Sequence, residues 1–258
     1  MTSEDPKVLY RYRHLQGEHR EWTRQILTDS ILHFASPLSL NDPFDCRVHF
    51  QPSLSNEELK QKFASLVKKY LPDLNRAQRR SKVKSDIGRL DRDNFIPQIS
   101  KGLQDGVDNC GILSLSATDR NILLWSHYAA GHTGVCLKFI ATDYTEFFGT
   151  ALPVEYKETY PEIGLLDDSP EQQIEAFLLT KAIDWKYEEE WRIIDHDGGA
   201  ADKVFPEELL VEVIMGARMK QEDKETVADW VGRRKAPIQL SQVSIIPGSF
   251  ALEIVALQ

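Results

Sequence analysis

Hydrophobic residues recur along this chain with two different periods. Alternation of apolar and polar residues predicts a β-strand, whereas apolar residues three or four positions apart predict an amphipathic helix. Residues 8–15, VLYRYRHL, alternate well enough to form a strand that places Arg11 and Arg13 on one face. The same reasoning predicts further strands at 31–34, 111–118, 133–140, 152–156, 188–195, 208–216, 242–247 and 250–257.

Helices are predicted where helical spacing coincides with start and stop signals. Residues 55–58 have the form of a capping box for a helix that runs to about Leu71. Ser169 and Pro170 open another helix, which runs to about Asp184. The other predicted helices occupy about 21–28, one or two segments up to 102, 119–131 and 221–234.

The order of these elements predicts the fold class. Strands and helices do not alternate regularly, which is unlike a doubly wound parallel sheet. No internal repeat or low-complexity linker divides the chain. We therefore predict one α+β domain over residues 1–258, with a helical insertion at about 55–103.

Charge is distributed unevenly. The formal net charge is −9, but the segment 60–92 contains eleven Lys or Arg residues and three acidic ones, so it carries +8 and the remainder carries −17. Basic clusters of this kind bind phosphate backbones or an acidic partner, and they also occur as solvated faces of helices. The segment 60–92 is thus a candidate surface for a nucleic-acid or protein acceptor.

Composition bounds the cellular setting. The 258 residues are 41% hydrophobic and 28% charged, which is typical of a globular protein with a sizeable core. No apolar run is long enough to span a bilayer, and the first residues lack the layout of a signal peptide. Three widely spaced cysteines argue against a disulfide framework. We therefore expect a cytoplasmic protein with no membrane partner.

The most informative stretch for chemistry is KAIDWKYEEEWRIIDH, residues 181–196. In an extended segment Glu188 and Glu190 share one face with Arg192. Two carboxylates on one face suit a site that stabilises a cationic or oxocarbenium-like centre, anchors a sugar hydroxyl or acts as a base. The same spacing fits an edge strand whose glutamates form structural ion pairs, and spacing alone leaves both interpretations open.

A predicted helix carries a second group of candidate side chains, in WSHYAAGHTGVC at 125–136. His127 and Tyr128 suit the wall of a nucleotide pocket, through stacking or hydrogen bonding, and His127 equally suits a packed position in the core. His127, His132 and Cys136 are potential zinc ligands. A fourth ligand is not evident and the spacing fits no compact zinc finger, so we predict no metal site.

Two further segments carry polar side chains. Asn41 and Asp42 lie in the turn SLNDPFDC, where turn formation explains them and ligand binding is the alternative. Ser114 and Ser116 share one face of a predicted strand, where a hydroxyl can orient a neighbour or face solvent. The chain has no Gly-rich phosphate loop, G-x-S-x-G elbow or HExxH helix, which sets aside kinase, P-loop, α/β-hydrolase and zincin functions.

Several of these motifs occur together in one known family. They are Y-R-Y at 10–12, L-N-D-P-F-D-C at 40–46, L-W-S-H-Y-A-x-x-H-x-G-V-C at 124–136, V-x-Y at 154–156 and K-x-x-x-W-x-Y-E-x-E-W-R-I at 181–193. In this combination nearly the whole chain resembles a prokaryotic domain-of-unknown-function family, number twenty-nine seventy-one. The resemblance implies no activity, and for a biological role it implies a toxin or phage-defence effector.

The layout also resembles the ADP-ribosyltransferase fold, in which a split of two small twisted sheets holds NAD. Members typically carry an Arg or His on the first strand, a Ser- or Tyr-bearing middle element and a late strand with a catalytic Glu, often as E-x-E. The residues that match these roles are, in order, Arg11 or Arg13; Ser114, Ser116 or Tyr128; and Glu188 with Glu190. The chain departs from the pattern in its S-x-S segment, which lacks the usual threonine, and in its large basic insertion.

This second resemblance implies an enzyme that uses NAD as its substrate, either a transferase or an NAD glycohydrolase. Glu190 would stabilise the oxocarbenium-like ribose as nicotinamide leaves, and Glu188 would assist it. An arginine of the first strand would hold phosphate or ribose, while Tyr128 and His127 would flank the nicotinamide.

Cofactor contacts are expected from the first strand, the S-x-S segment and the turn; the residues are Arg11, Arg13, Ser114, Ser116, Asn41 and Asp42. Two alternative functions stay open. One is a non-catalytic nucleotide- or nucleic-acid-binding module that uses the segment 60–92. The other is a metal-dependent nuclease built on Asp42, Asp45 and a glutamate.

Overall fold

Pairing between distant strands organises the body of the protein around one large sheet. The computed structural model describes residues 8–49, 56–161 and 169–257. The strands are β1 (Val8–Arg13), β2 (Ile31–Phe34), β3 (Gly111–Ser116), β4 (Val135–Ile140), β5 (Leu152–Pro153), β6 (Glu155–Lys157), β7 (Thr180–Ala182), β8 (Glu190–Asp195), β9 (Ala201–Val204), β10 (Leu210–Met215), β11 (Gln239–Ile245) and β12 (Leu252–Ala256). Eight of them form a sheet in the order β12-β11-β10-β4-β1-β3-β8-β5, and β2-β9 and β6-β7 form two small sheets.

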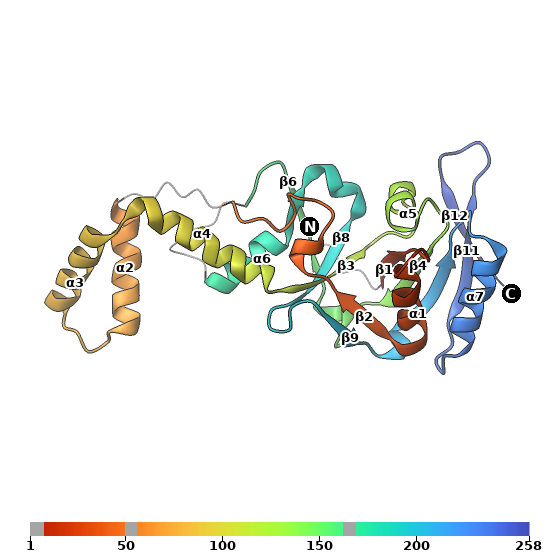
Figure 1. Cartoon of the computed structure of the whole chain (residues 1–258), viewed down its shortest axis with the longest axis horizontal. Coiled ribbons are helices and arrows are strands. Elements are labelled where there is room, and N and C mark those ends of the chain that lie inside the picture. The colour runs from red at the N-terminus through yellow and green to blue at the C-terminus, as the bar shows by residue number, and fades with distance from the viewer. Residues whose placement is uncertain (1–7, 50–55, 162–168, 258) are drawn as a thin grey trace.

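Helices cover this sheet and extend beyond it (Figure 1). They are α1 (His19–Asp29), α2 (Asn56–Tyr70), α3 (Arg76–Arg89), α4 (Arg92–Asp108), α5 (Ile122–Tyr128), α6 (Pro170–Leu178) and α7 (Gln221–Gly232), with short 3-10 helices η1 (Pro37–Ser39), η2 (Phe148–Thr150), η3 (Ile183–Glu188) and η4 (Glu207–Leu209). The predicted mixed α+β class is confirmed. In the described part of the chain, no helix combines the length and the apolar character of a membrane span.

The large sheet is nearly divided between β1 and β3. β1 pairs with β4 along its whole length, from Val8 to Arg13. With β3 it pairs only through Tyr10 and Ser116. One half of the sheet therefore contains β5, β8 and β3, and the other contains β1, β4, β10, β11 and β12.

Alternation along β1 explains how the two faces of its half-sheet are covered. Leu9 belongs to the larger core cluster, which also contains Leu27 of α1 and Val227 of α7. Tyr10 and Tyr12 point to the other face of β1, where they form a second core cluster with residues of α5. Because successive residues of a strand face opposite sides, Arg11 is kept on the side of Leu9.

The predicted elements are largely confirmed, and the main corrections lie between α6 and β8. The helix predicted to run to about Asp184 ends at Leu178, because the next residues pair with β6 as β7. The strand predicted at 188–195 begins at Glu190. Glu189 adopts a left-handed conformation (φ 45°, ψ 49°), which ends η3 and turns the chain into β8.

Smaller corrections concern the ends and the number of other elements. The predicted strand at 152–156 is divided, since β5 pairs with β8 whereas β6 pairs with β7. The last helix of the basic stretch continues past 102 to Asp108. β9 was not predicted and pairs with β2. The predicted cap residue Ser55 lies outside the described residues.

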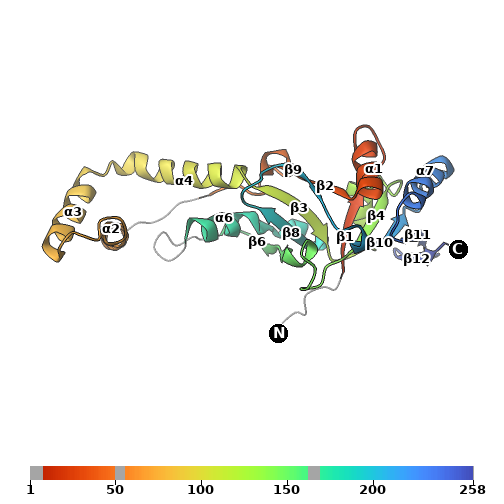
Figure 2. The same ribbon diagram turned by 90° about the horizontal axis from the view of Figure 1, so that it is seen from below.

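The insertion forms an arm. In Figures 1 and 2 the hairpin of α2 and α3 lies at the far end of α4, away from the large sheet in both views. The other end of α4 reaches the body, where Val107 belongs to a core cluster with Phe177 of α6. α3 itself has no buried residue, so the hairpin adds little to the core of the body.

Candidate functional site

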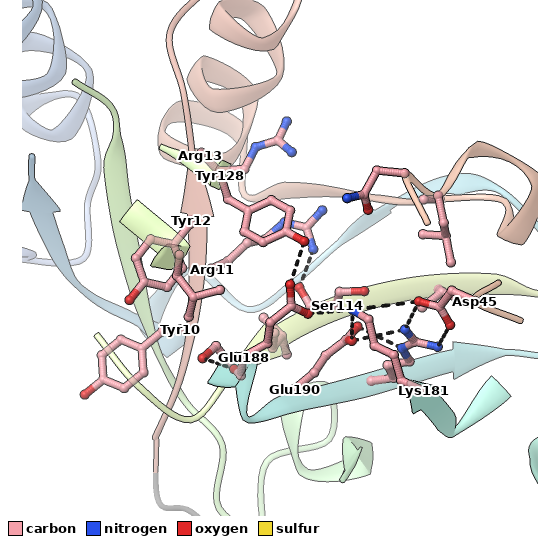
Figure 3. Close-up of a pocket in the computed structure, with 18 residues that line it drawn as sticks. Tyr10, Arg11, Tyr12, Arg13, Asp45, Ser114, Tyr128, Lys181, Glu188 and Glu190 are labelled. Carbon is pink, nitrogen blue, oxygen red and sulfur yellow. Dashed lines mark hydrogen bonds and ion pairs between the residues drawn. The ribbon is translucent and has the colours of Figure 1, made fainter. Parts of the chain in front are cut away.

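A pocket of about 210 Å3 opens where β1 and β3 separate (Figure 3). The neighbouring elements bring charged side chains to its lining from positions far apart in the sequence. They are Arg11 and Arg13 of β1, Asp45, Lys181 of β7, Glu188 of η3, and Glu190 and Arg192 of β8. The side chain of Arg11 spans the gap between the half-sheets, since its Nη1 donates to the carbonyl oxygen of Ser114 at 2.7 Å.

Lys181 lies between the two glutamates. Its Nζ donates to Oε2 of Glu188 at 2.5 Å and to Oε2 of Glu190 at 2.8 Å. All three side chains are at most 6% exposed, so these charges interact with little screening by water. Burial alone would lower the pKa of Lys181, but Glu190 and Glu188 raise it above its usual value, and the ammonium group stays charged.

Arg192 forms the second cationic centre of the cluster and is 1% exposed. Its guanidinium donates to both oxygens of Asp45, at 2.6 and 3.0 Å, and to both oxygens of Glu190, at 2.8 and 3.0 Å. Burial alone would raise the pKa of Glu190, but Arg192 and Lys181 outweigh that effect and lower it to about 2. Glu190 is therefore a fixed negative charge at neutral pH.

Hydrogen bonds from neighbouring elements hold the turn that carries the glutamates. The Tyr128 hydroxyl donates to Oε1 of Glu188 at 2.7 Å, and the Ser116 hydroxyl donates to the carbonyl oxygen of the same residue at 2.7 Å. The backbone N–H of Glu190 donates to the hydroxyl of Tyr156 at 2.7 Å. β3, which carries the S-x-S segment, and α5 thus position Glu188, and β6 positions Glu190.

The two arginines of β1 have donors without a partner in the described part of the chain. The Nε atoms of Arg11 and Arg13 are buried and have no hydrogen-bond partner within the described residues, and neither guanidinium forms an ion pair there. Burial and the nearby Arg13 lower the pKa of Arg11 to about 9, and burial lowers that of Arg13 to about 10. Such shifts mark positive charge that is partly desolvated and only partly compensated, and a bound anion would compensate it further. The partial compensation comes from Glu190 near Arg11 and from the ring of Trp22, whose centre lies 5.8 Å from the guanidinium carbon of Arg13.

The turn after η1 carries two aspartates with different roles. Asp45 belongs to the buried cluster, whereas Asp42 stabilises the turn. Asp42 accepts from the indole N–H of Trp185 at 2.7 Å and from the backbone N–H of Phe44 at 2.9 Å. This carboxylate braces the turn, and the pocket lining contains Asn41 and Asp45 instead.

The pocket brings together most of the residues predicted from the sequence. The predicted residues in its lining are Arg11, Arg13, Asn41, Ser114, Ser116, Tyr128, Glu188 and Glu190. His127 and Asp42 lie outside it, and His127 is exposed on the outer side of α5. Trp191 packs against the larger core cluster.

Three residues of the cluster were not predicted to line a nucleotide pocket, namely Asp45, Lys181 and Arg192. Asp45 was a candidate only for the nuclease alternative. For Arg192 the signal was present, because it shares a strand face with Glu190. The ion-pair interpretation is confirmed for both glutamates, and both also line the pocket. The accompanying prediction of an edge strand is wrong, because β8 lies between β3 and β5 in the sheet. Lys181 was placed in a helix that ends before it, which concealed its role.

The described residues hold no group of three or more His, Cys, Asp or Glu side chains that could bind a metal ion. Cys136 is fully buried, and the ring of His132 stacks on Trp125 with ring centroids 6.1 Å apart. All three cysteines are free.

Fold and site thus define a mixed α+β protein with a buried ionic cluster at one side of a pocket. Residues 124–193 match a family model described as a protein of unknown function (DUF2971), which supports the first of the two resemblances. The matched segment contains Tyr128, Lys181, Glu188, Glu190 and Arg192, whereas the arginines of β1 lie before it. No curated protein and no solved structure matches the chain.

Proposed function

We propose that this protein binds NAD in the pocket between the half-sheets and cleaves its nicotinamide–ribose bond, as an ADP-ribosyltransferase-like transferase or an NAD glycohydrolase. The observation that carries the proposal is the polarity of the pocket. At the β1 side, Arg11 and Arg13 contribute two positive charges without a carboxylate partner among the described residues. At the β8 side, three carboxylates and two cations leave one net negative charge.

This polarity suits the two ends of the reacting half of NAD. The phosphates are anionic, and guanidinium groups bind them through charge-assisted hydrogen bonds. The nicotinamide ring carries a positive charge that passes to the ribose as the bond breaks. A preorganised negative charge in a dry site stabilises that transition state most effectively.

The arrangement of strands also supports the proposal. β1, β3 and β8 are neighbours in the sheet and carry Arg11, Ser116 and Glu190. These are the three elements that the ADP-ribosyltransferase resemblance implies, and their side chains line one pocket. The single residue pair between β1 and β3 gives the large sheet the character of two smaller sheets.

The contacts suggest different roles for the two glutamates. Glu190 is held by Arg192 and Lys181, and supplies fixed negative charge next to the ribose. Oε1 of Glu188 accepts only from the Tyr128 hydroxyl among the described residues, so it retains capacity to accept from a ribose hydroxyl. At about 210 Å3 the pocket is smaller than the ~300–1,000 Å3 typical of sites that enclose a drug-sized ligand. We expect it to enclose the nicotinamide ribose half, with the adenosine half outside.

The nuclease alternative fits this geometry less well. Asp42 and Asp45 would have to offer free oxygens to a metal. The oxygens of Asp42 accept from Trp185 and Phe44, and those of Asp45 accept from Arg192. The alternative of a non-catalytic binding module would use the same pocket. The turnover assay described next distinguishes it from an enzyme.

The test is NAD turnover by the purified protein, followed as release of nicotinamide by chromatography, together with calorimetric binding of NAD. We expect Glu190→Gln to lower kcat by about 10²–10³-fold, which is typical of removing one electrostatic stabiliser of a transition state. Glu155→Gln is the matched control, since Glu155 forms an exposed ion pair with Lys157 and should keep full activity. Thermal unfolding of both variants shows whether a loss reflects misfolding.

Because Glu190→Gln also disturbs the buried cluster, Tyr128→Phe serves as a milder variant. It removes one hydrogen bond to Glu188 and keeps the ring. We expect a smaller fall in kcat, about tenfold, with little change in stability. Full turnover by folded Glu190→Gln would show that its assigned role is wrong. Binding of NAD without any turnover by the wild type would identify a binding module.

A further inference from the structure

The strongest feature outside the pocket is the positive charge of the basic arm, defined here as residues 60–92 at the end of the insertion. It carries +8, whereas the remainder of the chain carries −17. Figures 1 and 2 show the hairpin of α2 and α3 held away from the large sheet. The net positive charge of the arm thus lies apart from the body, which is acidic. The body would therefore repel a polyanion, whereas the arm would attract it.

One face of α3 concentrates this charge. Arg76, Arg80 and Lys84 are spaced four residues apart, which places them one above another at about 5–6 Å intervals along the helix. All three are exposed. Within the described residues none of the three forms an ion pair or side-chain hydrogen bond, whereas the neighbouring Lys82 donates to Asp86 at 2.7 Å.

The composition of this face favours nucleic acid over a protein partner. Cores of protein interfaces are apolar and contain few lysines, and the arginines that are enriched there accompany apolar and aromatic side chains. α3 has no buried residue, and the stripe contains only cations. A row of unpaired Lys and Arg side chains is instead what phosphate backbones bind.

An aromatic side chain lies at the end of α2 in the same arm. Tyr70 is 67% exposed, and Nζ of Lys69 lies 5.3 Å from the centre of its ring. An exposed ring beside cations offers a stacking surface for a base of a single strand.

We propose that the basic arm binds the phosphate backbone of nucleic acid without sequence preference, through the stripe of Arg76, Arg80 and Lys84. This inference is independent of NAD cleavage in the pocket. The binding should be electrostatic and should therefore weaken steeply as the salt concentration rises.

The experiment measures binding of the full chain to a labelled single-stranded DNA, the corresponding RNA and the corresponding duplex by fluorescence anisotropy, across a series of salt concentrations. The test variant combines Arg76→Gln, Arg80→Gln and Lys84→Gln. Loss of three phosphate contacts should reduce the slope of log K against log salt by about 2 to 3, and weaken binding about tenfold or more at low salt.

The matched control removes the same charge from exposed positions on the body, through Arg218→Gln, Lys220→Gln and Lys235→Gln. It should bind almost as the wild type does, and both triple variants should keep the same far-ultraviolet circular dichroism. Equal losses in the two triple variants, or wild-type binding by the arm variant, would overturn the proposal. So would tighter binding of polyglutamate than of all three oligonucleotides, since that would indicate an acidic protein partner.

Discussion

Lys181 Nζ lies 2.8 Å from Oε2 of Glu190, and the same ammonium group also binds Glu188. β7 and β8 are joined by η3 and a left-handed residue, and this short excursion brings the lysine back over the glutamates. A single buried cation therefore bridges the two glutamates in the pocket lining. Its removal tests how the cluster is held together.

We predict that Lys181→Met lowers the free energy of unfolding by about 3–5 kcal/mol, because it leaves buried carboxylates without their shared cation. The control is Lys157→Met, which breaks the exposed Lys157–Glu155 ion pair of 2.6 Å and should cost about 0–1 kcal/mol. Urea unfolding followed by tryptophan fluorescence measures both. Similar losses in the two variants would mean that the buried cluster contributes no more than a surface pair.

Acid should destabilise the protein through Glu190. Its pKa in the folded protein is about 2, below the ordinary value of 4.5. Its stabilising contribution is therefore complete above about pH 4.5 and is lost as the pH falls towards 2. We expect the free energy of unfolding to fall over this window, and Glu190→Gln to reduce that fall by up to about 1.4 kcal/mol per pH unit.

The pH experiment compares unfolding curves of the wild type and Glu190→Gln between pH 2 and pH 7. Glu155→Gln again serves as the control, because this exposed carboxylate pairs only at the surface. Parallel pH dependence in the wild type and Glu190→Gln would contradict the assigned ionisation of this residue.

The arginines of β1 should bind anions at a cost to stability. We predict that Arg13→Gln leaves the free energy of unfolding unchanged or raises it by about 1 kcal/mol, because it removes a partly desolvated charge beside Arg11. The same change should weaken binding of pyrophosphate about tenfold or more. Calorimetric titration with pyrophosphate and urea unfolding measure the two effects.

Arg20→Gln is the control for this prediction. Arg20 forms an ion pair with Asp223 at 2.8 Å and lies outside the pocket lining. The Arg20→Gln variant should lose about 0–1 kcal/mol in its free energy of unfolding and keep wild-type affinity for pyrophosphate. If Arg13→Gln instead destabilised the protein while its pyrophosphate affinity stayed the same, the arginine would be a structural residue.

The amino-acid sequence determined much of the fold because local patterns report local structure. Alternation found β1 and assigned Arg11 to the face opposite Tyr10. The same reasoning failed between 179 and 189, where pairing of β7 with β6 outweighed helical periodicity. A strand of three residues has no periodicity of its own, and only its partner across the sheet defines it.

Candidate site residues followed from the sequence when their chemistry was visible in one segment. The pair Glu188 and Glu190 is an example, as is Tyr128 on its helix. Lys181 was missed and Asp45 was considered only for a metal site, because each gains its place from contacts made in the folded chain. Lys181 pairs with the glutamates, and Asp45 pairs with Arg192. A turn residue and a lysine are common in any sequence, so no local pattern distinguishes them.

By itself the sequence determined most of the strand and helix segments, the two arginines on one face, the acidic pair and the charge of the arm. The tertiary structure alone decided that β1 and β3 separate after one residue pair, that a pocket opens between them and that its carboxylates share a buried lysine. The physical reason is that periodicity acts over a few residues, whereas desolvation and charge pairing depend on which distant segments meet.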